Sequence, residues 1–285
     1  MSAADLARLY DLDLVEDPGD LDLYLALAAR TGGPILELGV GTGRLAVPLA
    51  AAGYEVVGID TDPAMLDRAR ARARAAGVGE ADDGRLRLLE ADMTVCRLPE
   101  AGRFGLAILA LNTLFLVGGR AAQAAAVATL AAHLRPGGLA VVDVWLPTVD
   151  DLGRFDGRLS LEYVRHDAET DELVTKVVAA IVEPGTGLVE LTTIYEATPP
   201  SGGPLRRWLR TERLRLVGPD ELEGLVTGAG LVVETLAGDY ALSPLAADSE
   251  RAIVVARRPG RPGRRRRPAM ARQGPATTSG PEPSA

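Results

Sequence analysis

The chain has 285 residues, of which 47% are hydrophobic, and its formal net charge is −8. This is enough for one large or two small domains with a buried core, and no apolar run approaches the roughly 20 residues of a membrane span. The single Cys96 excludes an internal disulfide and a multi-cysteine metal site, and with only His133 and His166 we expect no metal centre. The N-terminus lacks the charged-then-apolar layout of a signal peptide, so we expect a soluble cytoplasmic protein without a membrane partner.

The charge is unevenly spread along the chain. Residues 257–285 carry a balance of +7, which leaves −15 for the remainder. An acidic body argues against a broad phosphate-binding face, so nucleic acid is not the expected partner. The tail 259–285 is rich in Arg, Pro and Gly without periodicity, which predicts disorder. Its arginine run at 264–267 leaves contact with nucleic acid open as an alternative.

Strand and helix signals alternate in the first half of the chain. Leucines at helical spacing predict a helix over 5–30. Further elements follow in order: strands at 34–39, 54–60, 85–92, 104–111 and 139–145, with helices ending at 52 and spanning 63–76 and 120–134. Such alternation, with nearly continuous apolar strands, predicts an α/β fold around a parallel, doubly wound sheet.

The pattern changes after Pro147. Residues 158–217 alternate apolar and polar side chains without a helical period, which predicts an antiparallel β insertion over 150–217. A short helix at 218–230 and two strands, LVVETLAG and RAIVVARR, are expected to close the fold, with the strands paired antiparallel.

A glycine turn follows the first predicted strand. The segment 35–44 reads ILELGVGTGR, so Gly39, Gly41 and Gly43 lie between a buried strand and the start of a helix. Glycine tolerates positive φ and lets backbone approach a ligand closely, while the helix start offers free N–H groups. Asp60 ends the next strand 21 residues after Gly39, where an acid can hold the two hydroxyls of a ribose.

The chemistry around this turn favours one cofactor class. The dinucleotide fingerprint would need a third glycine at position 44, which is Arg44. Glu37, two residues before the first glycine, would repel a pyrophosphate and attract an ammonium group. A cofactor with a ribose, an amine and no phosphate fits better, and S-adenosylmethionine is one. In these motifs, and in their order over residues 5–258, the chain resembles the class I S-adenosylmethionine-dependent methyltransferases.

The resemblance implies a Rossmann-like, mostly parallel seven-stranded sheet with a C-terminal antiparallel hairpin. It implies a methyltransferase domain over 1–149 and 218–258, a lid over 150–217 and a tail over 259–285. It also implies a set of cofactor-binding residues: Tyr10, Glu37, Gly39, Gly41, Gly43, Arg44, Asp60, Thr61, Met65, Asp92, Met93 and Asn112. Simpler roles stay open for some of them, such as a turn cap for Asp92, core packing for Met93, cover of the first helix turn for Arg44 and an interface role for Tyr10.

The acceptor is less defined. Strand 104–111 ends in LNTLF, without the N-P-P-aromatic signature of enzymes that methylate flipped bases, and there is no paired-cysteine nucleophile. This favours in-line transfer to N or O of a small molecule, with His166 as the first candidate base and a turn residue as its alternative role. Candidate pocket residues are aromatic: Trp145, Tyr163, Tyr195, Trp208 and Tyr240. The buried strand residue Asp143 needs a partner, in a loop or in the pocket.

Other classes of function stay open. They are an S-adenosylmethionine-binding enzyme of cyclase or decarboxylase type, a nucleic-acid methyltransferase that uses the basic tail, and a non-catalytic scaffold. The resemblance also leaves a homodimer through the insertion open.

Overall fold

The computed structural model describes residues 3–16, 18–79 and 83–260. The predicted tail, including its arginine run, therefore lies outside the described residues from 261 onward. Within the described residues, no helix is both long and apolar enough to cross a membrane.

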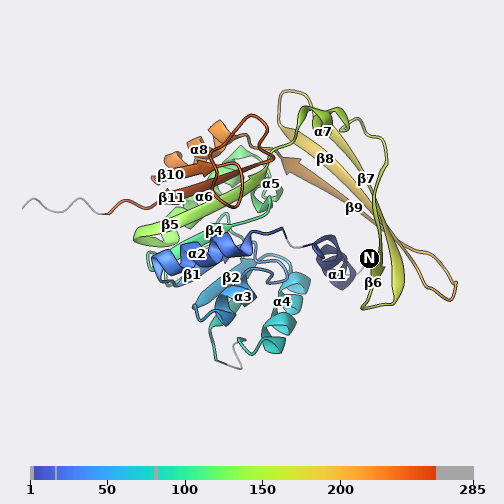
Figure 1. Cartoon of the computed structure of the whole chain (residues 1–285), viewed down its shortest axis with the longest axis horizontal. Helices are drawn as coiled ribbons and strands as arrows, with labels where there is room; N and C mark the ends of the chain where they lie inside the picture. The colour runs from blue at the N-terminus through green and yellow to red at the C-terminus, as the bar shows by residue number, and fades with distance from the viewer. Residues whose placement is uncertain (1–2, 17, 80–82, 261–285) are drawn as a thin grey trace, which may run out of the picture.

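A seven-stranded sheet forms the centre of the molecule (Figure 1), in the order β10-β11-β5-β4-β1-β2-β3. Its parallel strands are β1 (Ile35–Leu38), β2 (Val56–Asp60), β3 (Leu86–Glu90), β4 (Phe104–Leu109) and β5 (Leu134–Trp145). β10 (Val232–Ala237) pairs antiparallel with β11 (Arg251–Arg257), which pairs antiparallel with β5. The predicted doubly wound α/β fold and its closing hairpin are confirmed.

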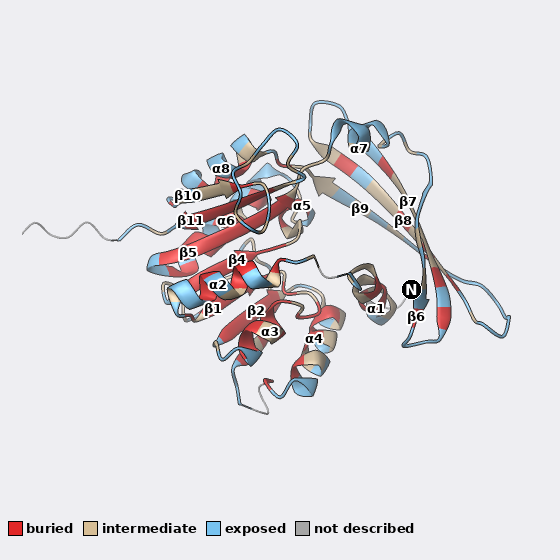
Figure 2. Ribbon diagram, in the orientation of Figure 1, coloured by how far each residue is buried: buried red, intermediate tan, exposed pale blue. Residues whose placement is uncertain are grey.

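Helices cover both faces of this sheet, so the central strands β1 and β4 are buried on both sides (Figure 2). One apolar cluster joins the sheet to α2 (Leu21–Thr31), α3 (Ala46–Ala51) and α4 (Pro63–Ala75). The other joins it to α5 (Thr113–Leu116), α6 (Arg120–His133) and α8 (Pro219–Gly228).

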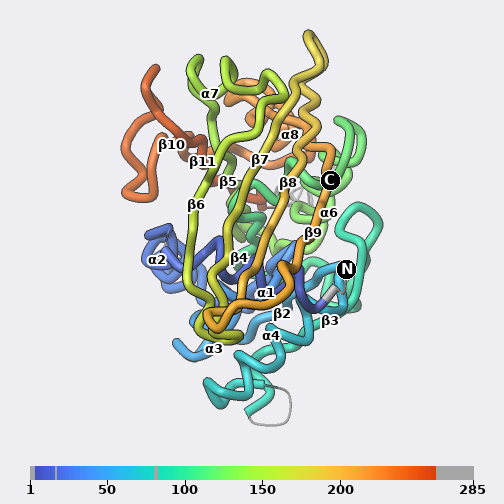
Figure 3. The backbone as a smooth tube through the Cα atoms, turned by 90° about the vertical axis from the view of Figure 1, so that its right-hand side faces the viewer, coloured from blue at the N-terminus to red at the C-terminus, as the bar shows by residue number. Residues whose placement is uncertain are grey.

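The insertion forms a second sheet of four antiparallel strands, in the order β6-β7-β8-β9. Their bounds are β6 (Ser160–Asp167), β7 (Glu172–Glu183), β8 (Leu188–Thr198) and β9 (Arg206–Arg215). The short α7 (Val149–Gly153) precedes this sheet in the chain. A capping box between Thr148 and Asp151 closes the N-terminus of α7. Figure 3 shows the four strands side by side, with α1 (Ala3–Asp13) behind them.

The N-terminal helix differs from the prediction. The single helix expected over 5–30 is two helices, α1 and α2, separated by a segment that contains Pro18 and Gly19. Gly19 has a φ of +77°, which continues no right-handed helix. α2 packs on the large sheet, whereas Leu9 and Leu12 of α1 pack on the second sheet. The break thus sends the first helix to the insertion.

Candidate active site

Two of the three turn glycines lie at a cavity. Gly39 has a φ of +72°, and a Cβ there would lie 2.4 Å from Cγ2 of Thr113. Gly41 has a φ of +53°, and a Cβ there would lie 3.7 Å from the Tyr10 ring, which covers the turn. A close approach therefore requires glycine at position 39, and both positions favour glycine because they adopt left-handed backbone.

The third glycine has another role. A Cβ at Gly43 would lie 3.1 Å from Val47 of α3 and 3.2 Å from Ala69 of α4, so this glycine lets the two helices pack closely. Val40 is buried over Gly58 of β2. A Cβ at Gly58 would lie 2.6 Å from Val40 Cγ2, so the valine fills a space that the glycine leaves.

Asp60 stands at the carboxyl end of β2, beside the turn. Its carboxylate accepts hydrogen bonds from the backbone N–H groups of Gly41, at 2.9 Å, and of Asp62, at 3.0 Å. These bonds fix the carboxylate at the cavity that it lines. Asp92 lines the same cavity and also caps a turn, accepting from the N–H and hydroxyl of Thr94. The Thr94 hydrogen bonds lower the pKa of Asp92.

Glu37 is a buried carboxylate with one unpaired oxygen. Only 4% of the residue is exposed, and Oε2 has no hydrogen-bond partner among the described residues. Burial raises its pKa from 4.5 to about 8, and the nearby Arg44 charge offsets part of the effect. An orphaned buried carboxylate oxygen at this turn fits a cofactor ammonium group.

Arg44 contacts Asp20 outside the cavity. Its guanidinium makes a bidentate pair with the fully buried Asp20, at 2.6 and 2.7 Å, and it does not line the cavity. Asp20 is the N-cap residue of α2, so the pair connects this helix to the end of the glycine turn. Arg44 thus pairs with the N-terminus of α2, which neither predicted role named, and a role in cofactor binding stays a prediction.

The loop after β4 forms the cavity floor. Asn112 lines the cavity with a φ of +64°, and its side-chain oxygen accepts from the Trp145 N–H at 2.5 Å. Asp143, which is fully buried, accepts three hydrogen bonds at this loop: from Leu111 N–H (3.3 Å), Tyr240 hydroxyl (2.9 Å) and Arg251 Nη1 (2.6 Å). Asp143 therefore holds the loop and does not face the cavity.

The cavity has a volume of about 1350 Å³ and lies between the glycine turn and the second sheet. Nine predicted residues line it: Tyr10, Gly39, Gly41, Asp60, Thr61, Met65, Asp92, Met93 and Asn112. Glu37, Gly43 and Arg44 do not. The opposite wall is the inner face of the second sheet, with Val178, Val189 and Leu191 among its side chains.

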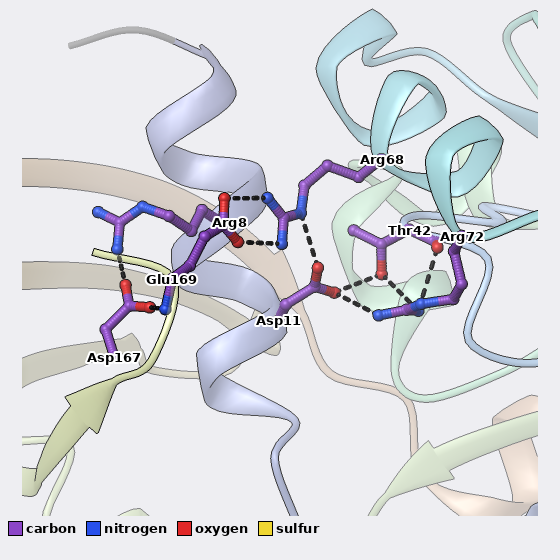
Figure 4. Close-up of polar contacts among 7 residues, drawn as sticks. All are labelled: Arg8, Asp11, Thr42, Arg68, Arg72, Asp167 and Glu169. Carbon is purple, nitrogen blue, oxygen red and sulfur yellow. Dashed lines mark hydrogen bonds and ion pairs between the residues drawn. The ribbon is translucent and has the colours of Figure 1, made fainter. Parts of the chain in front are cut away.

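Sequence reasoning missed the polar residues that join α1 to both walls (Figure 4). Asp11 accepts from the Thr42 hydroxyl at 2.6 Å, from Arg68 Nε at 2.7 Å and from Arg72 Nη2 at 3.2 Å. Arg68 reaches on to Glu169 of the insertion, and Arg8 pairs with Asp167.

Asp13 faces the second sheet. It accepts from the hydroxyls of Tyr163 and Tyr195, at 2.5 and 2.8 Å, and from Lys176 Nζ at 3.0 Å. Asp13, Lys176 and Tyr195 line the cavity. From the sequence alone, Asp11 and Asp13 resemble the solvent-exposed face of a helix, and no sequence motif includes them.

The structure does not bring His166 to the cavity. Its side chain is 58% exposed, its Nε2 lies 2.8 Å from Asp171 Oδ1, and neither residue lines the cavity. His133 is buried elsewhere, where its Nε2 accepts from the Leu98 N–H at 2.9 Å. Of the candidate aromatic residues, Trp145 and Tyr195 line the cavity, whereas Tyr163, Trp208 and Tyr240 do not.

This geometry agrees with comparisons to known proteins. Residues 35–138 match the family described as "Methyltransferase domain". The chain is 28% identical over 228 residues to the cypemycin N-terminal methyltransferase of a Streptomyces species, which covers 80% of this chain and 84% of that one. The CcbJ methyltransferase of Streptomyces caelestis superposes with a TM-score of 0.67 and 26% identity, over 85% of this chain and 91% of that one.

A third comparison concerns the fold alone. An S-adenosylmethionine-dependent methyltransferase of Clostridium acetobutylicum has a TM-score of 0.72 at 18% identity, over 90% of this chain and 98% of that one.

Fold, cofactor turn and comparisons together define an S-adenosylmethionine-binding transferase. These findings support a class I S-adenosylmethionine-dependent methyltransferase. The chain is an enzyme that uses S-adenosylmethionine as its cofactor and methyl donor.

Proposed function

We propose that the enzyme methylates the nitrogen of an amine in a small molecule or peptide. The observation that carries this proposal is that carboxylates able to bind an amine line the cavity, among them Asp13, Asp151 and Glu162, whereas no histidine does. Both histidines of the chain are described, and neither lines it. A hydroxyl acceptor needs a base at its reacting oxygen, whereas an amine needs only to be neutral.

The cofactor would occupy the half of the cavity beside the glycine turn. In this arrangement the Asp60 carboxylate accepts from the ribose hydroxyls and Glu37 holds the methionine ammonium. Asp92 accepts from the adenine amino group, Met93 flanks the ring, and Tyr10 covers the turn. Each role uses the polarity of a side chain that the structure places at or beside the turn.

The acceptor would occupy the half beside the second sheet. S-adenosylmethionine, when bound, would supply an electrophilic methyl group to the amine lone pair, and the electron pair of the broken C–S bond would stay with S-adenosylhomocysteine. The methylated ammonium then loses a proton to solvent. The protein's contribution is to align nitrogen, carbon and sulfur and to exclude water. In this proposal, residues 150–217 form the acceptor side of the site.

The test is transfer of an isotope-labelled methyl group from S-adenosylmethionine to pooled amines and alcohols, read by mass spectrometry. We expect labelled amines and stoichiometric S-adenosylhomocysteine. Label on alcohols alone contradicts nitrogen transfer. Cofactor consumption without any labelled acceptor favours a cyclase or decarboxylase instead.

A homodimer through the insertion is part of the same proposal. The outer face of the second sheet carries an apolar row in register across three strands: Val177, Ile194 and Leu209. Leu209 is 58% exposed, and uncovered apolar rows of this kind favour association. Sedimentation should give a dimer that Leu209→Glu dissociates, and a monomeric wild-type protein overturns it.

A further inference from the structure

One ion pair on the cavity wall connects no two elements of the fold. Arg210 Nη2 lies 2.5 Å from Glu212 Oε1, and both residues belong to β9. Residues two apart on a strand point to the same face. Both line the cavity, opposite Thr193 and Leu191 of β8, so the pair lies on the inner face.

Among the described residues, neither Arg210 nor Glu212 forms an ion pair or a side-chain hydrogen bond with another element of the fold. The cross-strand neighbours of the pair are uncharged, and the pair spans a single strand that the sheet already fixes. The other half-buried charge on this wall, Lys176, is bound to Asp13 and so attaches α1. Arg210 and Glu212 are 34% and 21% exposed, and an isolated pair of this kind contributes little to stability.

β9 also has a definite orientation in the cavity. Its carboxyl end is fixed to α6, because Gln123 accepts from Arg215 Nη1 at 2.7 Å and donates to the Arg215 carbonyl at 2.9 Å. The same end packs against α5, which begins at Thr113 beside Gly39. Along β9, Glu212 therefore lies toward α5, and Arg210 lies toward Tyr195 and α1.

We infer that Arg210 and Glu212 recognise an α-amino-acyl group, an amine whose neighbouring carbon bears a carbonyl or carboxylate. Glu212, on the α5 side of the cavity, accepts from the amine. Arg210 donates to the adjoining oxygen, whose acceptor geometry suits a guanidinium. This inference rests on the proposed nitrogen transfer and names its acceptor.

Proton chemistry agrees with this choice. A peptide α-amine has a pKa of about 7.7–8.0, far below the roughly 10.4 of a lysine side chain, so it is substantially neutral near neutral pH. Such an acceptor needs no strong base in the cavity. The cypemycin enzyme, to which the chain is similar, is by its name a methyltransferase of an N-terminus.

The experiment uses the full chain with S-adenosylmethionine and four probes. They are a pooled tripeptide-amide library with free N-termini, the same library N-acetylated, free alanine and glucosamine. We expect methylation of the free library and not of the acetylated one. Turnover of free alanine as well would identify amino acids as a second source of the same group.

Two variants and a control test the residues. Glu212→Gln and Arg210→Gln should each raise the KM for the free library by about tenfold or more, the worth of one charge-assisted hydrogen bond, with unchanged S-adenosylmethionine affinity. Glu196→Gln removes the pair that Glu196 makes with Arg207 on the outer face and should change KM by less than about twofold.

The failures are distinguishable. Methylation of glucosamine without the library overturns the α-amino-acyl inference and leaves nitrogen transfer standing. Methylation of neither amine, with transfer to alcohols in the wider pool, overturns both. An unchanged KM in both variants, with intact cofactor binding, overturns the assignment of Arg210 and Glu212.

Discussion

Glu37 makes cofactor binding dependent on pH in a direction that the structure fixes. Its pKa is about 8 because the carboxylate is buried, with Oε2 unpaired. Below pH 8 the empty site therefore holds a protonated Glu37. The methionine ammonium of the cofactor favours the ionised form, so binding must release this proton.

The sign for stability follows from the same values. Between pH 4.5 and about 8 the unfolded chain loses a proton that the folded chain keeps at Glu37. The free energy of unfolding without cofactor therefore falls as pH rises, by up to about 1.4 kcal/mol per pH unit, and levels off above pH 8. The whole shift is worth at most about 5 kcal/mol. Glu37→Gln should remove this dependence.

The sign for binding is opposite. S-adenosylmethionine affinity should rise by up to about tenfold per unit between about pH 5.5 and 7.5, a range chosen below the pKa of an α-amine. Glu37→Gln should flatten the profile and weaken binding at pH 7.5 by about 1.5–3 kcal/mol, the worth of a hydrogen bond to a charged group.

Calorimetry in buffers of different ionisation enthalpy measures the affinity and the released proton together. Glu100→Gln is the matched control, because Glu100 does not line the cavity and is paired with Arg87 at 2.7 Å. A wild-type affinity that is flat with pH, with no proton released, would refute the reasoning. So would a Glu37→Gln profile that keeps the wild-type slope.

The remaining predictions concern cofactor, turn and base. Asp60→Ala should weaken S-adenosylmethionine by about 1–3 kcal/mol in calorimetry, since the hydroxyls lose their acceptor, and an unchanged Kd contradicts its assigned role. Gly32→Ala, at a φ of +75° in open space, should cost about 1 kcal/mol in urea unfolding. Gly39→Ala adds contact with Thr113 and should cost about 1–3 kcal/mol more, so equal losses refute the close-approach argument. His166→Ala should leave the turnover rate within about twofold of the wild-type value. A fall of about 10² in that rate, with loss of one limb of its pH profile, would show that His166 acts as the general base.

Local sequence was sufficient to predict the cofactor side of the cavity. The turn from Gly39 to Gly43 and the acid at Asp60 belong to one strand-turn-helix-strand unit, whose geometry follows from nearby residues. The predicted residues that do not line the cavity have partners elsewhere in the chain. Arg44 meets Asp20, and Gly43 meets Ala69 of α4, and neither contact has a signature in the motif itself.

The acceptor side could not be predicted in the same detail, because a strand's facing depends on register. A β-bulge between Leu161 and Tyr163 shifts the pairing of β6 with β7. His166 then lies opposite Leu173, which is half exposed, and the preceding Arg165 lies opposite the buried Val174. One residue of shift decides which side chains face the cavity, and the alternating pattern alone does not reveal it.

α1 explains how two sheets of different design form one cavity. Successive helical residues turn by about 100°, so Asp11 and Asp13, two apart, point to nearly opposite sides. Asp11 holds Thr42 of the cofactor turn, and Asp13 holds Tyr195 of the second sheet. Tyr10 directly precedes Asp11 in sequence and lies over Gly41 in space. The helix therefore bridges the donor and acceptor walls through Asp11 and Asp13 and places Tyr10 over the turn.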